Sequence, residues 1–209
     1  MSIKNRKEVD FYQELSSDIY SAMIAVLPAG WSVAVVDNTE RPDLPQQVDA
    51  LCDSLGVFRV GSSFPRVLPD IVLGVLGPDH RLKLAMFEVK GPKTSVGLID
   101  YSQMFGYLHS AELIACGVLL LVEKHHLPSP LSLDLRRVID GLRLPCHWTF
   151  KNLANDSERT YRSGIASFLE GSHIRWIDLS SLSGICSWSD LAHSLLESDV
   201  SIVVNAVAR

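Results

Sequence analysis

The sequence predicts an α/β domain in which helices flank a central β-sheet. Residues 8–27 place apolar side chains at helical spacing, residues 70–90 have the pattern of a hydrophobic β-hairpin, and residues 116–124 form a strongly apolar strand. Helical and strand patterns that alternate along a chain are typical of α/β folds. A chain of 209 residues is long enough to bury one substantial core, so we expect a single domain over residues 1–209.

The N-terminal part is expected to form a helix, a strand and a second helix. The first helix, over residues 8–27, ends where Pro28 and Gly30 supply a stop. The β-branched segment 31–37 is typical of a strand, and residues 46–56 have the pattern of a short helix that ends at a glycine. The apolar side chains that define the first helix are Phe11, Leu15, Ile19, Ala22, Met23 and Val26.

A β-hairpin follows, preceded by an expected edge strand over residues 57–60. Its strands, 70–76 and 81–90, flank the turn formers Gly, Pro and Asp. A turn centred on Asp79 sets an antiparallel register, which pairs Leu76 with Leu82, Gly74 with Leu84, Val72 with Met86, and Asp70 with Glu88. Alternation then gives the second strand a core-facing side and an opposite side. The core-facing side carries Leu82, Leu84, Met86, Glu88 and Lys90, and the opposite side carries Arg81, Lys83, Ala85, Phe87 and Val89.

After the hairpin, a helix from Ile99 to Ala115 is expected to precede the apolar strand 116–124. Residues 8–124 would then form the core of the domain. Residues 125–209 are expected to form a C-terminal α/β extension packed on this core. The expected elements of the extension are helices over 132–142, 157–171 and 187–198 and a strand over 173–179.

Composition argues against several classes of protein. The net charge of −5 argues against a protein that simply coats nucleic acid, because such binding depends on Lys and Arg. No apolar run approaches the roughly 20 residues of a membrane-spanning helix, and the N-terminus lacks the pattern of a secretory signal. The four cysteines lack the close pairs of zinc or redox motifs and are expected to be buried thiols. We therefore expect a cytoplasmic protein with no membrane partner.

The hairpin carries three charged residues at one end, Asp70, Glu88 and Lys90. Two adjacent carboxylates repel unless a cation lies between them, and hard oxygen ligands suit Mg²⁺ or Mn²⁺. A lysine beside such an ion can orient an attacking water, and the ion can stabilise charge that develops on a phosphate. Phosphodiester hydrolysis fits these residues. The alternative is structural: Asp70 caps the start of its strand, and Glu88 and Lys90 form a solvated pair at a strand end.

Two motifs in this region resemble those of a known nuclease family. Pro69-Asp70, followed after 17 residues by Glu88-Val89-Lys90, resembles the signature of the PD-(D/E)XK nuclease superfamily. The next expected helix contains DYSQMFGYLHS, in which Gln103 and Tyr107 are four residues apart, similar to the Q-x-x-x-Y motif of the RecB-like branch. The resemblance implies a restriction-endonuclease-like core with a mixed central β-sheet, in the order αβββαβ, over residues 8–124.

The resemblance also implies a role for each matched residue. Asp70 and Glu88 would bind Mg²⁺ or Mn²⁺, and Lys90 would position the attacking water. Gln103 and Tyr107 would support the site or contact the nucleic-acid backbone. Ordinary packing on a helix surface is the alternative for these last two residues.

Further acidic and basic residues are candidates around the site. Members of the family often add an acidic residue from the first helix, for which Glu14 is preferred over Glu8. A solvated helix face is the alternative for both. Lys93 and Arg66 flank the hairpin and are candidates for phosphate contacts, although isolated basic residues on a surface often have no such role.

The main hypothesis is a Mg²⁺-dependent nuclease that hydrolyses DNA, with Asp70, Glu88 and Lys90 at its centre. The rival is a non-catalytic nucleic-acid-binding or scaffold module of the same fold in a larger complex, which the acidic net charge favours. RNA stays open as a substrate, because a contact to a 2′-hydroxyl leaves no local signature in the sequence. A homodimer and a larger protein complex both stay open as well.

Overall fold

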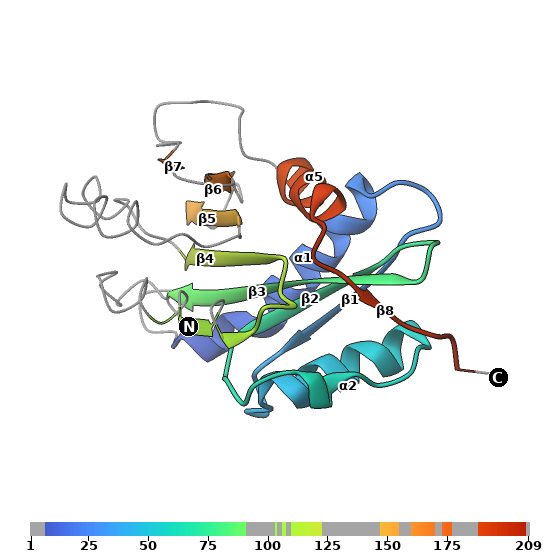
Figure 1. The fold of residues 1–209 in the computed structure, drawn as a ribbon. Helices are drawn as coiled ribbons and strands as arrows, with labels where there is room; N and C mark the ends of the chain where they lie inside the picture. Colours follow the sequence, from blue (N-terminus) through green and yellow to red (C-terminus); the bar gives the residue numbers. More distant parts are fainter. Residues whose placement is uncertain are drawn as a thin grey trace.

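A mixed β-sheet lies at the centre of the molecule, with helices on both of its faces (Figure 1). Within the part of the chain that the structure describes, the sheet has eight strands. The α/β class predicted from the sequence is confirmed. The structure is a computed structural model, and it describes residues 7–90, 103, 106–107, 110–122, 147–154, 160–169, 173–176 and 188–207.

The first seven strands follow one another across the sheet in chain order, and the last returns to the third. They are β1 (Ser32–Asp37), β2 (Ile71–Leu76), β3 (Arg81–Lys90), β4 (Cys116–Val122), β5 (His147–Ala154), β6 (Thr160–Leu169), β7 (His173–Trp176) and β8 (Ile202–Val203). β4 runs parallel to β3 and β5, and the other pairs are antiparallel. Strands from the C-terminal extension therefore belong to the same sheet as the hairpin β2–β3.

The helices agree closely with the sequence prediction. They are the 3₁₀ helices η2 (Glu8–Phe11) and η3 (Gly61–Ser63) and the α-helices α1 (Tyr12–Val26), α2 (Leu44–Leu55) and α5 (Trp188–Glu197). α2 begins two residues before the prediction because Asp43 caps it: its carboxylate accepts from Gln46 N at 3.1 Å, and Gln46 Oε1 accepts from Asp43 N at 2.9 Å. The helix ends at Gly56, whose φ of 70° is readily adopted by glycine.

The central hairpin is buried on both faces, and the predicted division into a core-facing and an opposite side is therefore wrong. α2 packs over Val72, Leu84 and Met86 on one face. On the other face, α1 and α5 pack over the side chains of Leu73 and Phe87 and their neighbours. Burial on both sides accounts for the nearly continuous apolar sequence of β2 and β3, a pattern that central strands share.

Two further predictions fail where long-range pairing decides the structure. The segment 57–60 forms no strand, and Val57 makes only an isolated bridge to Ala206. Residues 157–171 were expected to be helical, but β6 occupies Thr160–Leu169 and pairs along β5. A local pattern with helical spacing does not show such a partner, since tertiary pairing overrides propensity.

The remaining elements are confirmed in part. The helix predicted from Ile99 to Ala115 has helical backbone at the described positions 103, 106, 107 and 110, but it is no longer helical at 111–115. The helix predicted over 132–142 lies outside the described residues. Cys52 and Cys116 are buried thiols that form no disulfide, and the other two cysteines lie outside the described side chains. Among the described residues, no helix has the length and apolar character needed to cross a membrane.

The C-terminal part of the chain returns to the hairpin through a buried lysine. Lys83 is 7% exposed, and its Nζ donates to the carbonyls of Leu196 and Ser198 at 2.6 and 2.7 Å. These carbonyls lie at the C-terminal end of α5, where a cation also interacts favourably with the helix dipole. Burial lowers the pKa of Lys83, and the nearby Asp79 and Asp199 oppose this shift.

We expect Lys83→Met to destabilise the protein by about 1–3 kcal/mol, because two carbonyls would lose a charged donor. Urea unfolding measures the change. The matched control is Arg81→Met on the same strand, where the side chain is about half exposed and pairs with Asp79. That control should cost under about 1 kcal/mol. Equal losses in the two variants would contradict the role given to Lys83.

Candidate functional site

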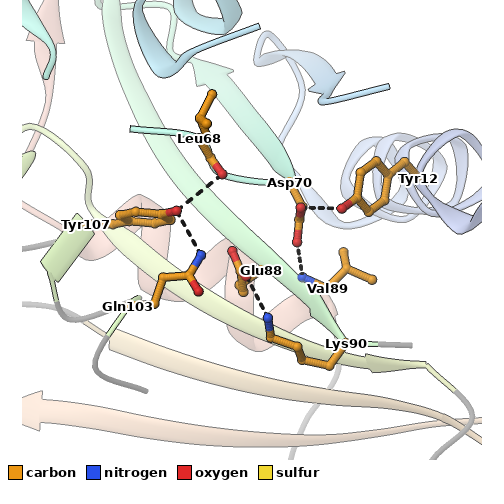
Figure 2. A network of polar contacts seen from close by, with 8 residues as sticks. All are labelled: Tyr12, Leu68, Asp70, Glu88, Val89, Lys90, Gln103 and Tyr107. Carbon is orange, nitrogen blue, oxygen red and sulfur yellow. Dashed lines mark hydrogen bonds and ion pairs between the residues drawn. The ribbon is translucent and has the colours of Figure 1, made fainter. Parts of the chain in front are cut away.

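Asp70, Glu88 and Lys90 lie together at the end of the hairpin where β3 extends beyond β2 (Figure 2). The predicted register is confirmed for Leu76 with Leu82, Gly74 with Leu84 and Val72 with Met86. Pairing with β2 ends at Ile71 with Phe87, and among the described strands Glu88, Val89 and Lys90 pair with β4. Asp70 precedes β2, and its N–H donates to Phe87 O at 3.0 Å. The sequence thus correctly brings Asp70 next to the Glu88 end of β3.

The Asp70 carboxylate occupies the position where β2 would have continued. Its Oδ2 accepts from Val89 N at 2.7 Å, and its Oδ1 accepts from the Tyr12 hydroxyl at the start of α1 (Figure 2). Tyr12 was not among the residues singled out from the sequence. Tyr12 lies three residues, or nearly one helical turn, before the buried Leu15, and this spacing indicates that it faces the sheet.

The backbone around Asp70 is also held in place. Asn38 N donates to Asp70 O at 2.8 Å, and Gln47 Nε2 donates to Pro69 O at 2.9 Å and to Pro42 O at 3.0 Å. Gln47 is fully buried, although sequence reasoning gave it no role. The sequence does offer one indication of this role, because Gln47 is a polar residue on the apolar side of α2. Together these bonds fix Asp70 from the residue that follows β1, from α2 and from β3.

Glu88 and Lys90 form a buried ion pair. Lys90 Nζ lies 2.8 Å from Glu88 Oε1, and the two residues are 7% and 4% exposed, respectively. The solvated pair that was the alternative for these residues is therefore wrong. Glu88 Oε2 is buried and has no hydrogen-bond partner within the described part of the chain. An unpaired carboxylate oxygen is costly in a protein interior, and a bound cation would remove that cost.

Burial and mutual repulsion raise the pKa values of both carboxyl groups. The pKa of Glu88 rises from its ordinary value of 4.5 to about 7, chiefly by burial and then by the Asp70 charge, against the effect of Lys90. Burial also raises the pKa of Asp70, while the bonds from Tyr12 and Val89 and the Lys90 charge lower it. The pKa of Tyr12 is raised by burial and by Asp70, so its hydroxyl remains a donor. A divalent cation would reverse the carboxylate shifts.

Gln103 and Tyr107 lie on the other side of Glu88 from Asp70 (Figure 2). Gln103 Nε2 donates to the Tyr107 hydroxyl at 2.8 Å, and that hydroxyl lies 3.4 Å from Leu68 O. Leu68 is two residues before Asp70, so the pair braces the segment that carries this carboxylate. Burial raises the pKa of Tyr107, the bond from Gln103 opposes this shift, and the charges of Glu88 and Asp70 add to it.

The other residues predicted from the sequence to support the site or to bind phosphate lie in different places. The charge of Glu8 contributes to the raised pKa values of Asp70 and Glu88. Glu14 lies two residues after Tyr12 on α1, or about 200° around the helix, and its role as a supporting residue stays a prediction. The Arg66 side chain is 90% exposed and lies 3.8 Å from Asp43. Lys93 lies outside the described residues.

The donor set fits a hard divalent cation with few protein ligands. Among the described residues, no group of three His, Cys, Asp or Glu side chains forms a ready metal site. Mg²⁺ often takes only one or two carboxylates, with water and substrate phosphates completing its coordination. Asp70 and Glu88 provide two adjacent carboxylates, and Glu88 Oε2 provides an oxygen without a partner in this part of the chain. These two residues would hold the ion.

We expect the stability of the cation-free protein to fall as the pH rises from about 4.5 to about 7. Glu88 binds its proton more tightly in the folded chain than in the unfolded chain, so its favourable contribution is lost as it ionises. Urea unfolding over this range, in the presence of EDTA, measures the fall. The variant Glu88→Gln cannot ionise and should show a shallower slope. The same slope in both proteins would exclude the raised pKa.

No family model matches the sequence, and no curated protein matches it. The functional interpretation therefore depends on the residues of the site and on their geometry.

Proposed function

We propose that the protein is a metal-dependent nuclease that hydrolyses DNA phosphodiester bonds. The observation that carries this proposal is the meeting of Asp70, Glu88 and Lys90 at one end of the hairpin, where Glu88 Oε2 is buried without a described partner. A buried pair of carboxylates beside a lysine is expensive to maintain for stability alone. The same three groups supply the parts that hydrolysis of a phosphodiester requires.

The order of elements supports a restriction-endonuclease-like core as part of this proposal. α1 is followed by the antiparallel strands β1, β2 and β3, then by helical backbone at Gln103 and Tyr107, and then by β4 parallel to β3. α2 is an addition between β1 and β2. With the carboxylates on β3 and just before β2, this order agrees with the core that the sequence motifs imply.

Each residue of the site has a distinct part in the proposed reaction. Asp70 and Glu88 would hold the cation, and a bound Mg²⁺ or Mn²⁺ would supply positive charge that stabilises the negative charge of the phosphate. Lys90 Nζ lies 2.8 Å from Glu88 Oε1, so it is within reach of a water molecule at that carboxylate. Its ammonium group orients this water by donating hydrogen bonds. Gln103 and Tyr107 keep the segment before Asp70 in place.

The rival proposal is a binding or scaffold module in which the site no longer acts. The net charge of −5 favours it, since few basic side chains remain to neutralise phosphates. The ion pair between Glu88 and Lys90 also satisfies part of the site without a metal. Cation-independent DNA binding without hydrolysis would favour this rival.

We expect the purified protein to cleave labelled DNA in Mg²⁺ or Mn²⁺ and to lose this activity in EDTA. Glu88→Gln and Lys90→Met should each lower the cleavage rate at least about 100-fold, because each removes a group that acts on the cation or on the attacking water. A panel of single-stranded DNA, duplex DNA and RNA measures the substrate class in the same assay.

The matched control is Glu112→Gln, which removes the charge of an exposed carboxylate that is not among the site residues. It should leave the rate unchanged, and circular dichroism should show that all variants are folded. Cleavage that survives Glu88→Gln would come from another site or from a contaminant. Binding without cleavage in either metal would overturn the proposed activity and favour the rival.

A further inference from the structure

The strongest unassigned feature near the carboxylates is Tyr12. It is the first residue of α1 and is 7% exposed, and its ring packs in the apolar cluster beneath the hairpin. Its hydroxyl donates a hydrogen bond to Asp70 Oδ1, a residue 58 positions further along the sequence. An exposed tyrosine on the same helix, Tyr20, makes a natural comparison.

We propose that Tyr12 is a positioning residue of the cation site and acts through Asp70. This inference rests on the proposed function. Val89 N–H already holds Asp70 Oδ2 at 2.7 Å, so the Tyr12 hydroxyl fixes the second oxygen and thereby the rotation of the carboxylate. Without it, one bond would remain and the carboxylate would turn about its χ2 angle.

The Tyr12 bond leaves room for a cation on the same carboxylate. Each carboxylate oxygen has two lone pairs, and the described bonds use one on Oδ1 and one on Oδ2. The remaining lone pairs are thus held in fixed directions. A ligand oriented in advance binds a metal more tightly, because less freedom is lost on binding.

The polar groups around Asp70 explain why a phenol suits this position. Lys90 attracts the carboxylate toward Glu88, whereas Tyr12 and Val89 hold it toward α1 and the backbone of β3. A neutral donor fixes the oxygen without neutralising its charge. A lysine or arginine at the same position would compete with the cation for the carboxylate.

The test is Mn²⁺ affinity, measured by electron paramagnetic resonance of free Mn²⁺ in the absence of DNA. Tyr12→Phe removes only the hydroxyl and should raise the Kd for Mn²⁺ about 10–100-fold. The matched control Tyr20→Phe removes a hydroxyl from an exposed position of the same helix and should leave the Kd unchanged. Asp70→Asn should abolish detectable binding.

A kinetic measurement separates positioning from general damage to the fold. Raising the Mn²⁺ concentration should restore kcat of Tyr12→Phe to within about threefold of the natural protein, because the chemical groups are intact. Lys90→Met should stay inactive at every concentration. A Tyr12→Phe defect that no Mn²⁺ concentration reverses would overturn the positioning role.

The outcomes for the inference and for the proposed function are distinct. An unchanged Kd in Tyr12→Phe, with Mn²⁺ binding lost in Asp70→Asn, would overturn the role of Tyr12 and leave the proposed cation site standing. Failure of the natural protein to bind Mn²⁺ would overturn the cation site itself.

Discussion

The site depends on a mismatch in length between two neighbouring strands. β3 continues through Lys90, but its pairing with β2 ends at Phe87, so the Val89 N–H that faces β2 has no strand partner. Asp70 supplies a carboxylate oxygen to this donor. A buried backbone donor must be satisfied, and an acidic side chain does so while bringing negative charge next to Glu88. The same bond therefore satisfies the free backbone donor of β3 and brings the Asp70 charge close to Glu88. A bound cation would offset the repulsion between these two carboxylates.

The position of the hairpin within the fold explains why this charge is so concentrated. Helices cover both faces of β2 and β3, so water has little access to Glu88 and Lys90. Low exposure strengthens both the repulsion between the carboxylates and the attraction to Lys90. The segment around Asp70 is held in place by other bonds: Asn38 N donates to the carbonyl of Asp70, and Gln47 Nε2 donates to the carbonyl of Pro69. The Asp70 carboxylate is thus oriented by the protein in the absence of a cation.

Local patterns predicted what depends on nearby residues and failed where distant partners decide. The turn at Gly77 to His80 and the alternation around it were enough to give the hairpin register, and Asp70 followed from that register. The strand β6 was missed because its partner β5 is a separate segment, and no periodicity within 157–171 reveals it. Tyr12 and Gln47 were missed for a related reason: each acts on the segment at Asp70 from 58 and 22 residues away. The choice between Glu8 and Glu14 depends on how the two N-terminal helices lie on the sheet. Glu8 belongs to the 3₁₀ helix η2 and Glu14 to α1, a division that the helical spacing over residues 8–27 does not reveal.

The bond from Lys83 to the end of α5 has a consequence for the biosynthesis of the protein. β3 lies near the middle of the chain, yet Lys83 finds its acceptors at Leu196 and Ser198, and Arg81 and Leu82 pair with β8. During translation, the hairpin emerges from the ribosome more than a hundred residues before these partners. Contacts of such long sequence separation form late and slow folding. A partly folded nascent chain would therefore expose the parts of β3 that α5 and β8 cover until these two elements are made, a stage at which chaperones act on many proteins.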